Sequence, residues 1–218
     1  MTQLFRRRAN SVTSFSIAVF GGVCFCGLGF CTVLKWTSWQ TQIGVPLEQP
    51  VPFSHKHHVS GLGIDCRYCH EGVTHAAYAG MPSTHTCMTC HSQIWQGASM
   101  LEPIRKSFAT GKPIHWKRLY RLPKYVYFDH SIHVNQGIGC TSCHGQIQEM
   151  PMTWKTGAFY MKDCLACHRE PEKWIRPREE VFNQNWVPPG DSREAGLILV
   201  RKYQVPTKRL TDCYTCHR

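Results

Sequence analysis

Five short motifs in this 218-residue chain combine two cysteines and a histidine at one fixed spacing. Each reads Cys-x-x-Cys-His, and they lie at residues 66–70, 87–91, 140–144, 164–168 and 213–217. Two thiols three residues apart can form thioethers with the two vinyl groups of one haem, and the adjacent histidine then lies beneath the iron. The spacing therefore predicts five covalently bound c-type haems.

The residues that would hold these haems form two sets. The attachment residues are Cys66, Cys69, Cys87, Cys90, Cys140, Cys143, Cys164, Cys167, Cys213 and Cys216. The proximal iron ligands are His70, His91, His144, His168 and His217. Structural zinc would not require a histidine after every second cysteine, and five pairs leave one unmatched. Disulfides in such short loops would give little stabilisation and would not select the histidine.

Eight histidines lie outside the motifs, and four of them recur in a second pattern. Phe-x-His-x-x-His precedes the first and third motifs, at residues 53–58 and 128–133. Residues i and i+3 share one face of a helix, so each segment can present imidazoles to two different irons. A haem that only carries electrons needs both axial positions filled. His55, His58, His130 and His133 are therefore the predicted distal ligands, and His57 is predicted to lie at the surface.

The sixth ligand of the fifth iron is less clearly marked. Met161 stands three residues before Cys164 and is the predicted ligand. Thioether ligation raises the potential of a haem, so this site would be a high-potential stop among bis-histidine haems. The alternatives are Met150, Met152, His85 and His115.

The order of the motifs is repeated along the chain. His-x-x-His, Cys-x-x-Cys-His, Met-Pro and Cys-x-x-Cys-His follow one another twice. We expect a first dihaem module at residues 36–103, a basic and aromatic connector at 104–127, and a second dihaem module at 128–175. An extended tail with the fifth haem would follow at 176–218. Few residues are available per haem, so the predicted fold class is a multihaem cytochrome c, with mostly loops and short α-helices around five stacked haems.

The N-terminal segment has the composition of a membrane span. No charged residue occurs from Ala9 to Leu34, and a helix over residues 13–35 could cross the hydrocarbon layer. A cleaved signal peptide would have a shorter apolar region and a small-x-small cleavage site. We therefore expect an uncleaved signal anchor after a cytoplasmic basic N-terminus at 1–12. Arg6, Arg7 and Arg8 would hold this end in the cytoplasm and place the haems on the periplasmic side of the membrane.

Basic residues outnumber acidic ones by 25 to 14. Nucleic acid is disfavoured as a partner, because neither a clustered basic face nor a nucleic-acid-binding motif is present. Haem propionates would offset most of the excess, since each haem brings about two carboxylates.

Longer stretches between the motifs resemble one family in particular, the pentahaem cytochrome c subunit of bacterial alternative complex III. The resemblance lies in GIDCRYCH, AGMPSTHTCMTCHSQIW, LEPIRKSFATGKPI, YVYFDHSIHVNQGIGCTSCHG and CLACHREPEKWIRPREEVFN, and the haem units are similar to those of class III cytochromes c. It implies a non-catalytic, membrane-anchored electron-transfer subunit of a quinol:electron acceptor oxidoreductase. The implied partners are an iron–sulfur, molybdopterin-oxidoreductase-like subunit, integral membrane quinol-binding subunits, and a monohaem cytochrome subunit or soluble carrier.

Two other functions fit the motifs less well. An anchored multihaem quinol dehydrogenase that feeds a periplasmic reductase would place its first haem soon after the membrane helix, whereas 31 residues separate Leu34 from Cys66. A multihaem reductase such as a pentahaem nitrite reductase would keep one iron open and typically carries a Cys-x-x-Cys-Lys site. All five motifs here end in histidine, which favours electron transfer over catalysis.

Overall fold

The computed structural model describes residues 6, 8–188 and 190–217. Arg7 and residues 1–5, which belong to the predicted cytoplasmic N-terminus, lie outside the described residues, as does Arg218. The chain divides into two compact units, Met1–Ile43 and Gly44–Arg218.

One long helix makes up most of the first unit. α1 (Arg8–Trp36) has 29 residues and buries none of them. At 1.5 Å per residue it is about 43 Å long, and its apolar composition suits a helix that crosses a membrane. It begins five residues before the predicted span of 13–35. A single turn, α2 (Ser38–Thr41), follows.

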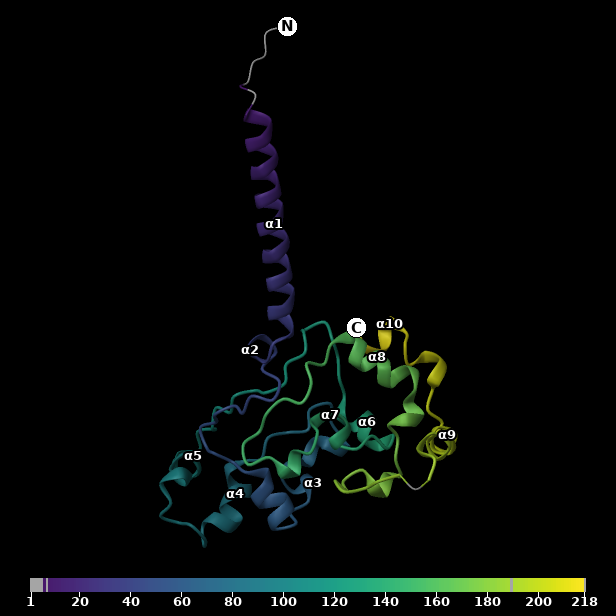
Figure 1. Cartoon of the computed structure of the whole chain (residues 1–218). Coiled ribbons are helices and arrows are strands. Elements are labelled where there is room, and N and C mark those ends of the chain that lie inside the picture. The colour runs from purple at the N-terminus through teal and green to yellow at the C-terminus, as the bar shows by residue number, and fades with distance from the viewer. Residues whose placement is uncertain (1–5, 7, 189, 218) are drawn as a thin grey trace. The chain divides into compact units, whose positions relative to one another are not determined.

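The second unit consists of short helices joined by loops (Figure 1). Its α-helices are α3 (Cys66–Cys69), α4 (Thr84–His91), α5 (Glu102–Thr110), α6 (His130–Asn135), α7 (Thr141–His144), α8 (Met161–Arg169), α9 (Ser192–Lys202) and α10 (Cys213–Cys216). A π-helix, η1 (Lys56–Gly61), is accompanied by the 3-10 helices η2 (Glu71–Thr74), η3 (Ser99–Leu101), η4 (Ile147–Glu149), η5 (Pro171–Lys173), η6 (Arg178–Glu180) and η7 (Thr207–Arg209). The residues described here form two isolated antiparallel bridges and no strand. The predicted architecture of loops and short helices is confirmed.

The side-chain core of this unit is small. Nine apolar side chains are buried among the described residues. Val51, Leu101 and Ile104 form one cluster, and a second consists of Val73, Val134 and Val181. A unit of this length normally buries far more apolar surface. A chain that folds around large apolar prosthetic groups needs fewer apolar side chains of its own.

The structure differs from the expected boundaries at the connector. α5 begins at Glu102, before the boundary predicted at residue 104, and its Ile104 packs against Val51 of the first module. Residues 102–110 therefore belong with the first module by packing. Both modules and the tail lie in the same compact unit.

The sequence predicts an extended tail from residue 176, but the structure shows a helix within it. Its longest element is α9, which packs against η5. The Asp191 carboxylate accepts a hydrogen bond from the Arg193 backbone N–H at 2.9 Å and so caps the helix N-terminus. Gly196 permits the packing, because a Cβ there would overlap the backbone carbonyl of Glu172.

Candidate haem-binding sites

All five Cys-x-x-Cys-His motifs lie in helical turns. α3, α7 and α10 are single turns within their motifs, whereas α4 and α8 carry a motif in their C-terminal part. Helical spacing puts the two thiols of a motif on one face, with the histidine beside them. None of the ten cysteines is in a disulfide, so each thiol is available to a haem vinyl group.

The two Phe-x-His-x-x-His segments adopt the same local geometry. In the first, the ring of Phe53 stacks on His58 with centroids 4.4 Å apart and meets His55 edge-on at 4.9 Å. Phe128 repeats both contacts in the second segment, at 4.4 Å and 4.8 Å. The repeat read from the sequence therefore extends to side-chain packing, although η1 is a π-helix and α6 an α-helix.

The second histidine of each segment is held by the carbonyl four residues before it. His58 Nδ1 lies 2.9 Å from the oxygen of Ser54, and His133 Nδ1 lies 2.7 Å from that of Asp129. A carbonyl only accepts, so Nδ1 carries the proton and Nε2 keeps its lone pair. Metal-binding imidazoles are commonly oriented in this way.

Three pairs of histidine rings lie at nearly one separation, with interplanar angles of 65° for His58 and His91, 5° for His130 and His144, and 27° for His133 and His168. Two imidazoles on opposite sides of one iron, each with a bond of about 2 Å, hold their ring centres roughly 6 Å apart. The observed centroid distances are 6.3 Å for His58 and His91, 6.5 Å for His130 and His144, and 6.1 Å for His133 and His168. Each gap therefore fits an iron with two axial imidazoles.

The donors occur as facing pairs and not as larger clusters. Among the described residues, no three His, Cys, Asp or Glu side chains are grouped so as to hold a bare metal ion. A tetrahedral zinc site takes four such ligands. A haem iron takes only two from the protein, because the porphyrin supplies the other four.

His55 is the remaining histidine of the two Phe-x-His-x-x-His segments, and the first motif is the one left in its module to pair with it. In the second module the first histidine of the segment faces the first motif, and the second histidine faces the second motif. The same rule pairs His55 with His70. Burial, followed by the charges of His70, His58 and His144, lowers the pKa of His55 to about 4. Its imidazole is thus neutral at pH 7, as an iron ligand must be.

Backbone carbonyls also orient four of the proximal histidines, His70, His91, His168 and His217. Burial lowers the pKa of His144 to about 4, so that ring is neutral as well. The Nδ1-to-oxygen distances are 2.7 Å from His70 to Gly80, 3.3 Å from His91 to Ile94, 2.8 Å from His168 to Leu210 and 3.1 Å from His217 to Tyr125.

The fifth site differs from the others. The His217 ring stacks on Tyr125, with centroids 5.9 Å apart. Met161, the first residue of α8, is 64% exposed, so Met161 as sixth ligand stays a prediction. Among the alternatives, Met150 is buried, Met152 is half-buried, His115 is exposed, and His85 meets Phe108 edge-on at 4.7 Å.

His57 lies at the surface, as predicted. It is exposed, and its ring stacks on that of Trp95.

The role of the loop at residues 76–80 could not be predicted from the sequence. His130 Nδ1 lies 2.9 Å from the carbonyl of Ala77, and His70 Nδ1 lies 2.7 Å from that of Gly80. Carbonyl partners carry no side-chain signal, and only the positive φ of Gly80, 88°, has a residue-type signature.

The fold and the paired histidines define the class of protein as a multihaem cytochrome c. A profile described as cytochrome c7 and related cytochrome c matches residues 126–218. The multihaem cytochrome c subunit of menaquinone reductase from Nitratidesulfovibrio vulgaris is 34% identical over 198 residues, which cover 88% of this chain and 79% of the relative. The chain belongs to this family of multihaem cytochrome c subunits, whose haems are of the covalently bound c type.

Proposed function

We propose that this protein is the membrane-anchored pentahaem electron-transfer subunit of a quinol:electron acceptor oxidoreductase of the alternative complex III type. The facing histidine pairs are the observation that carries the proposal. An iron with imidazoles on both sides has no position left for a substrate, so it suits electron transfer and not catalysis. Similarity to a menaquinone reductase subunit supports a link to quinone chemistry.

The residues have three roles in this proposal. The ten motif cysteines attach five haems, the motif histidines bind the irons on one side, and the four Phe-x-His-x-x-His histidines bind four of them on the other. Met161 completes the fifth. A low-spin haem supplies reversible one-electron transfer when bound. The carbonyls on Nδ1 keep the imidazoles aimed through Nε2, which preserves their alignment during turnover.

The anchor and partners follow the same proposal. α1 would hold the protein in the cytoplasmic membrane as a single span, with Arg6 and Arg8 on the cytoplasmic side and the haems on the periplasmic side. The electron source would be an iron–sulfur, molybdopterin-oxidoreductase-like subunit beside integral membrane quinol-binding subunits. A monohaem cytochrome subunit or a soluble carrier would receive the electrons.

The relative supports a second candidate with the opposite direction of flow. Its name states that it belongs to a menaquinone reductase, so that complex delivers electrons to a quinone. The pattern of histidine pairs serves either direction, because a relay of one-electron carriers is reversible. The direction is set by the partners and potentials.

Purification of the complex through a tag on this subunit tests both candidates. We expect five haems by mass, an iron–sulfur subunit and membrane subunits in the preparation, and haem reduction by added menaquinol. Menaquinone reduction with no quinol oxidation would overturn the proposed direction and support the second candidate. Quinol oxidation by the isolated subunit would identify an anchored quinol dehydrogenase, and a ligand-accessible high-spin haem in the native protein would indicate a reductase.

A further inference from the structure

We propose that the five haem sites follow one another in space in the order Cys87, Cys66, Cys140, Cys164, Cys213, naming each site by its first cysteine. This order exchanges the first two sites relative to the sequence. The inference rests on the proposed function, in which all five motifs carry haem, and adds which site neighbours which. Figure 1 shows the same succession, from α4 through α3 and α7 to α8 and α10.

The Cys87 and Cys66 sites are neighbours through two contacts. Their distal ligands, His58 and His55, are three residues apart at the start of η1. The Tyr68 hydroxyl from one motif and the Thr89 hydroxyl from the other lie 2.8 Å apart in a hydrogen bond. Both contacts are made by residues of these two sites alone, so the two sites adjoin directly.

The Cys87 site lies at the end of the series. Cys87 and Met88 pack against the cluster of Val51, Leu101 and Ile104, which comes from the first module and from α5. α5 in turn makes its main helix contact with α4. This site is therefore covered by the protein on one side and adjoins the Cys66 site on the other.

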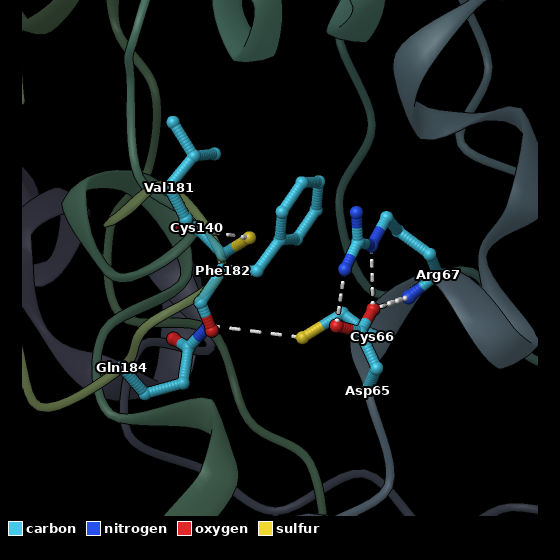
Figure 2. Close-up of polar contacts among 7 residues, drawn as sticks. All are labelled: Asp65, Cys66, Arg67, Cys140, Val181, Phe182 and Gln184. Carbon is cyan, nitrogen blue, oxygen red and sulfur yellow. Dashed lines mark hydrogen bonds and ion pairs between the residues drawn. The ribbon is translucent and has the colours of Figure 1, made fainter. Parts of the chain in front are cut away.

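The Cys66 site, and not the Cys87 site, adjoins the second module. Figure 2 shows the segment 181–184 beside the two first cysteines: Gln184 Nε2 donates to Cys66 Sγ at 3.7 Å, and Cys140 Sγ lies 4.0 Å from the Val181 carbonyl. Phe182 belongs to this segment, and the Arg67 guanidinium lies 4.5 Å from its ring centre. One short segment therefore contacts both sites at once.

A second connection supports the same junction. The loop at residues 76–80 gives its Gly80 carbonyl to His70 of the Cys66 site and its Ala77 carbonyl to His130, the distal ligand of the Cys140 site. The backbone N–H of His130 also donates to the Ala77 carbonyl at 3.1 Å. The carbonyls that orient these two ligands are only three residues apart, so the two haem sites lie close together.

The remaining two junctions follow in sequence order. His130 and His133 on α6 face His144 and His168, so one helix joins the Cys140 and Cys164 sites. The His168 ring is held by the carbonyl of Leu210, three residues before Cys213. The last site therefore adjoins the Cys164 site and forms the other end of the series.

Two ends follow from this order. The Cys87 site and the Cys213 site each adjoin one other haem site, whereas the three sites between them each adjoin two. If the sites followed the sequence instead, the Cys66 site would be the first end.

Electron cryo-microscopy of the intact purified complex tests the order, because thioether density identifies each porphyrin by its cysteines. We expect the Cys66 iron to have the Cys87 and Cys140 irons as its two nearest neighbours, and the Cys213 iron to have only the Cys164 iron as a near neighbour. Five porphyrins with the Cys66 iron at an end would overturn the order and leave the proposed function standing. Motifs without porphyrin density would overturn the proposed function itself, and the order with it.

Discussion

The imidazole rings of His130 and His144 lie parallel to within 5°, with their centres 6.5 Å apart. One ring comes from the start of α6 and the other from the end of α7. Their separation is close to the distance that one iron with two axial imidazoles requires. This relationship supports the proposal of His130 as the distal ligand of the Cys140 site, and ring pairs at similar separations support His58 and His133 in the same role.

Replacement of His58 by methionine should raise the midpoint potential of one haem. Thioether ligation favours the reduced iron, and axial ligands set haem potentials over roughly 0.8 V, so a rise of about a tenth of that range is expected. A spectroelectrochemical titration of the purified protein measures it. His57→Met is the matched control, because His57 is exposed and next in sequence, and should leave all midpoints unchanged. Equal shifts in both variants would contradict the ligand assignment.

His130→Ala should open one iron to external ligands. The reduced variant is expected to bind about one carbon monoxide per protein and to show a high-spin haem signal, because no imidazole then faces His144. The native protein should bind none. His75→Ala provides the control, since His75 is exposed and outside both Phe-x-His-x-x-His segments. Carbon monoxide binding by the control alone would rule out the assigned role of His130.

Met161→Leu tests the predicted sixth ligand of the fifth iron. Loss of a coordinating thioether should remove the highest midpoint potential of the titration, because no ligand then stabilises the reduced iron in the same way. Met152→Leu removes one of the alternative ligands and should change nothing. An unchanged titration for Met161→Leu, with a change for Met152→Leu, would transfer the ligand role to Met152.

Phe182→Ala should weaken the junction between the two modules. Phe182 is half-buried, packs against the Val73, Val134 and Val181 cluster, and receives the Arg67 guanidinium on its ring. We expect a loss of about 2 kcal/mol in the free energy of unfolding, measured by denaturant titration of the haem-loaded protein. Val187→Ala, at a side chain that is 77% exposed, should cost less than about 0.5 kcal/mol. A stability equal to that of the native protein would show that Phe182 does not stabilise the junction.

Gly196→Ala should destabilise the tail despite the better helix propensity of alanine. A Cβ at this position overlaps the Glu172 backbone, so α9 must move away from η5 at a cost of about 2 kcal/mol. Gly97→Ala is the matched control, because nothing lies within 4 Å of the position of its Cβ. Thermal unfolding of both variants measures the difference, and a stable Gly196→Ala protein would refute the close packing of α9.

Local chemistry could be read from the sequence. Thioether attachment requires two thiols at i and i+3 followed by a histidine, and a membrane span requires an unbroken apolar run. Both features depend on residues that are close together in the sequence, so both can be predicted from it. The Phe-x-His-x-x-His segments were visible for the same reason, and their ring contacts repeat almost unchanged. The helical form of the tail was missed, because its main support is the contact of Gly196 with a distant backbone.

The sequence by itself determined which residues are predicted to bond to haem and which histidines are candidates for the far side of the irons. Only the tertiary structure decided which histidine faces which, and hence which haem sites adjoin. The reason is physical: bonds to one haem vinyl pair are set by neighbouring residues, whereas ring pairs and shared carbonyls depend on how loops such as 76–80 and 181–184 pack.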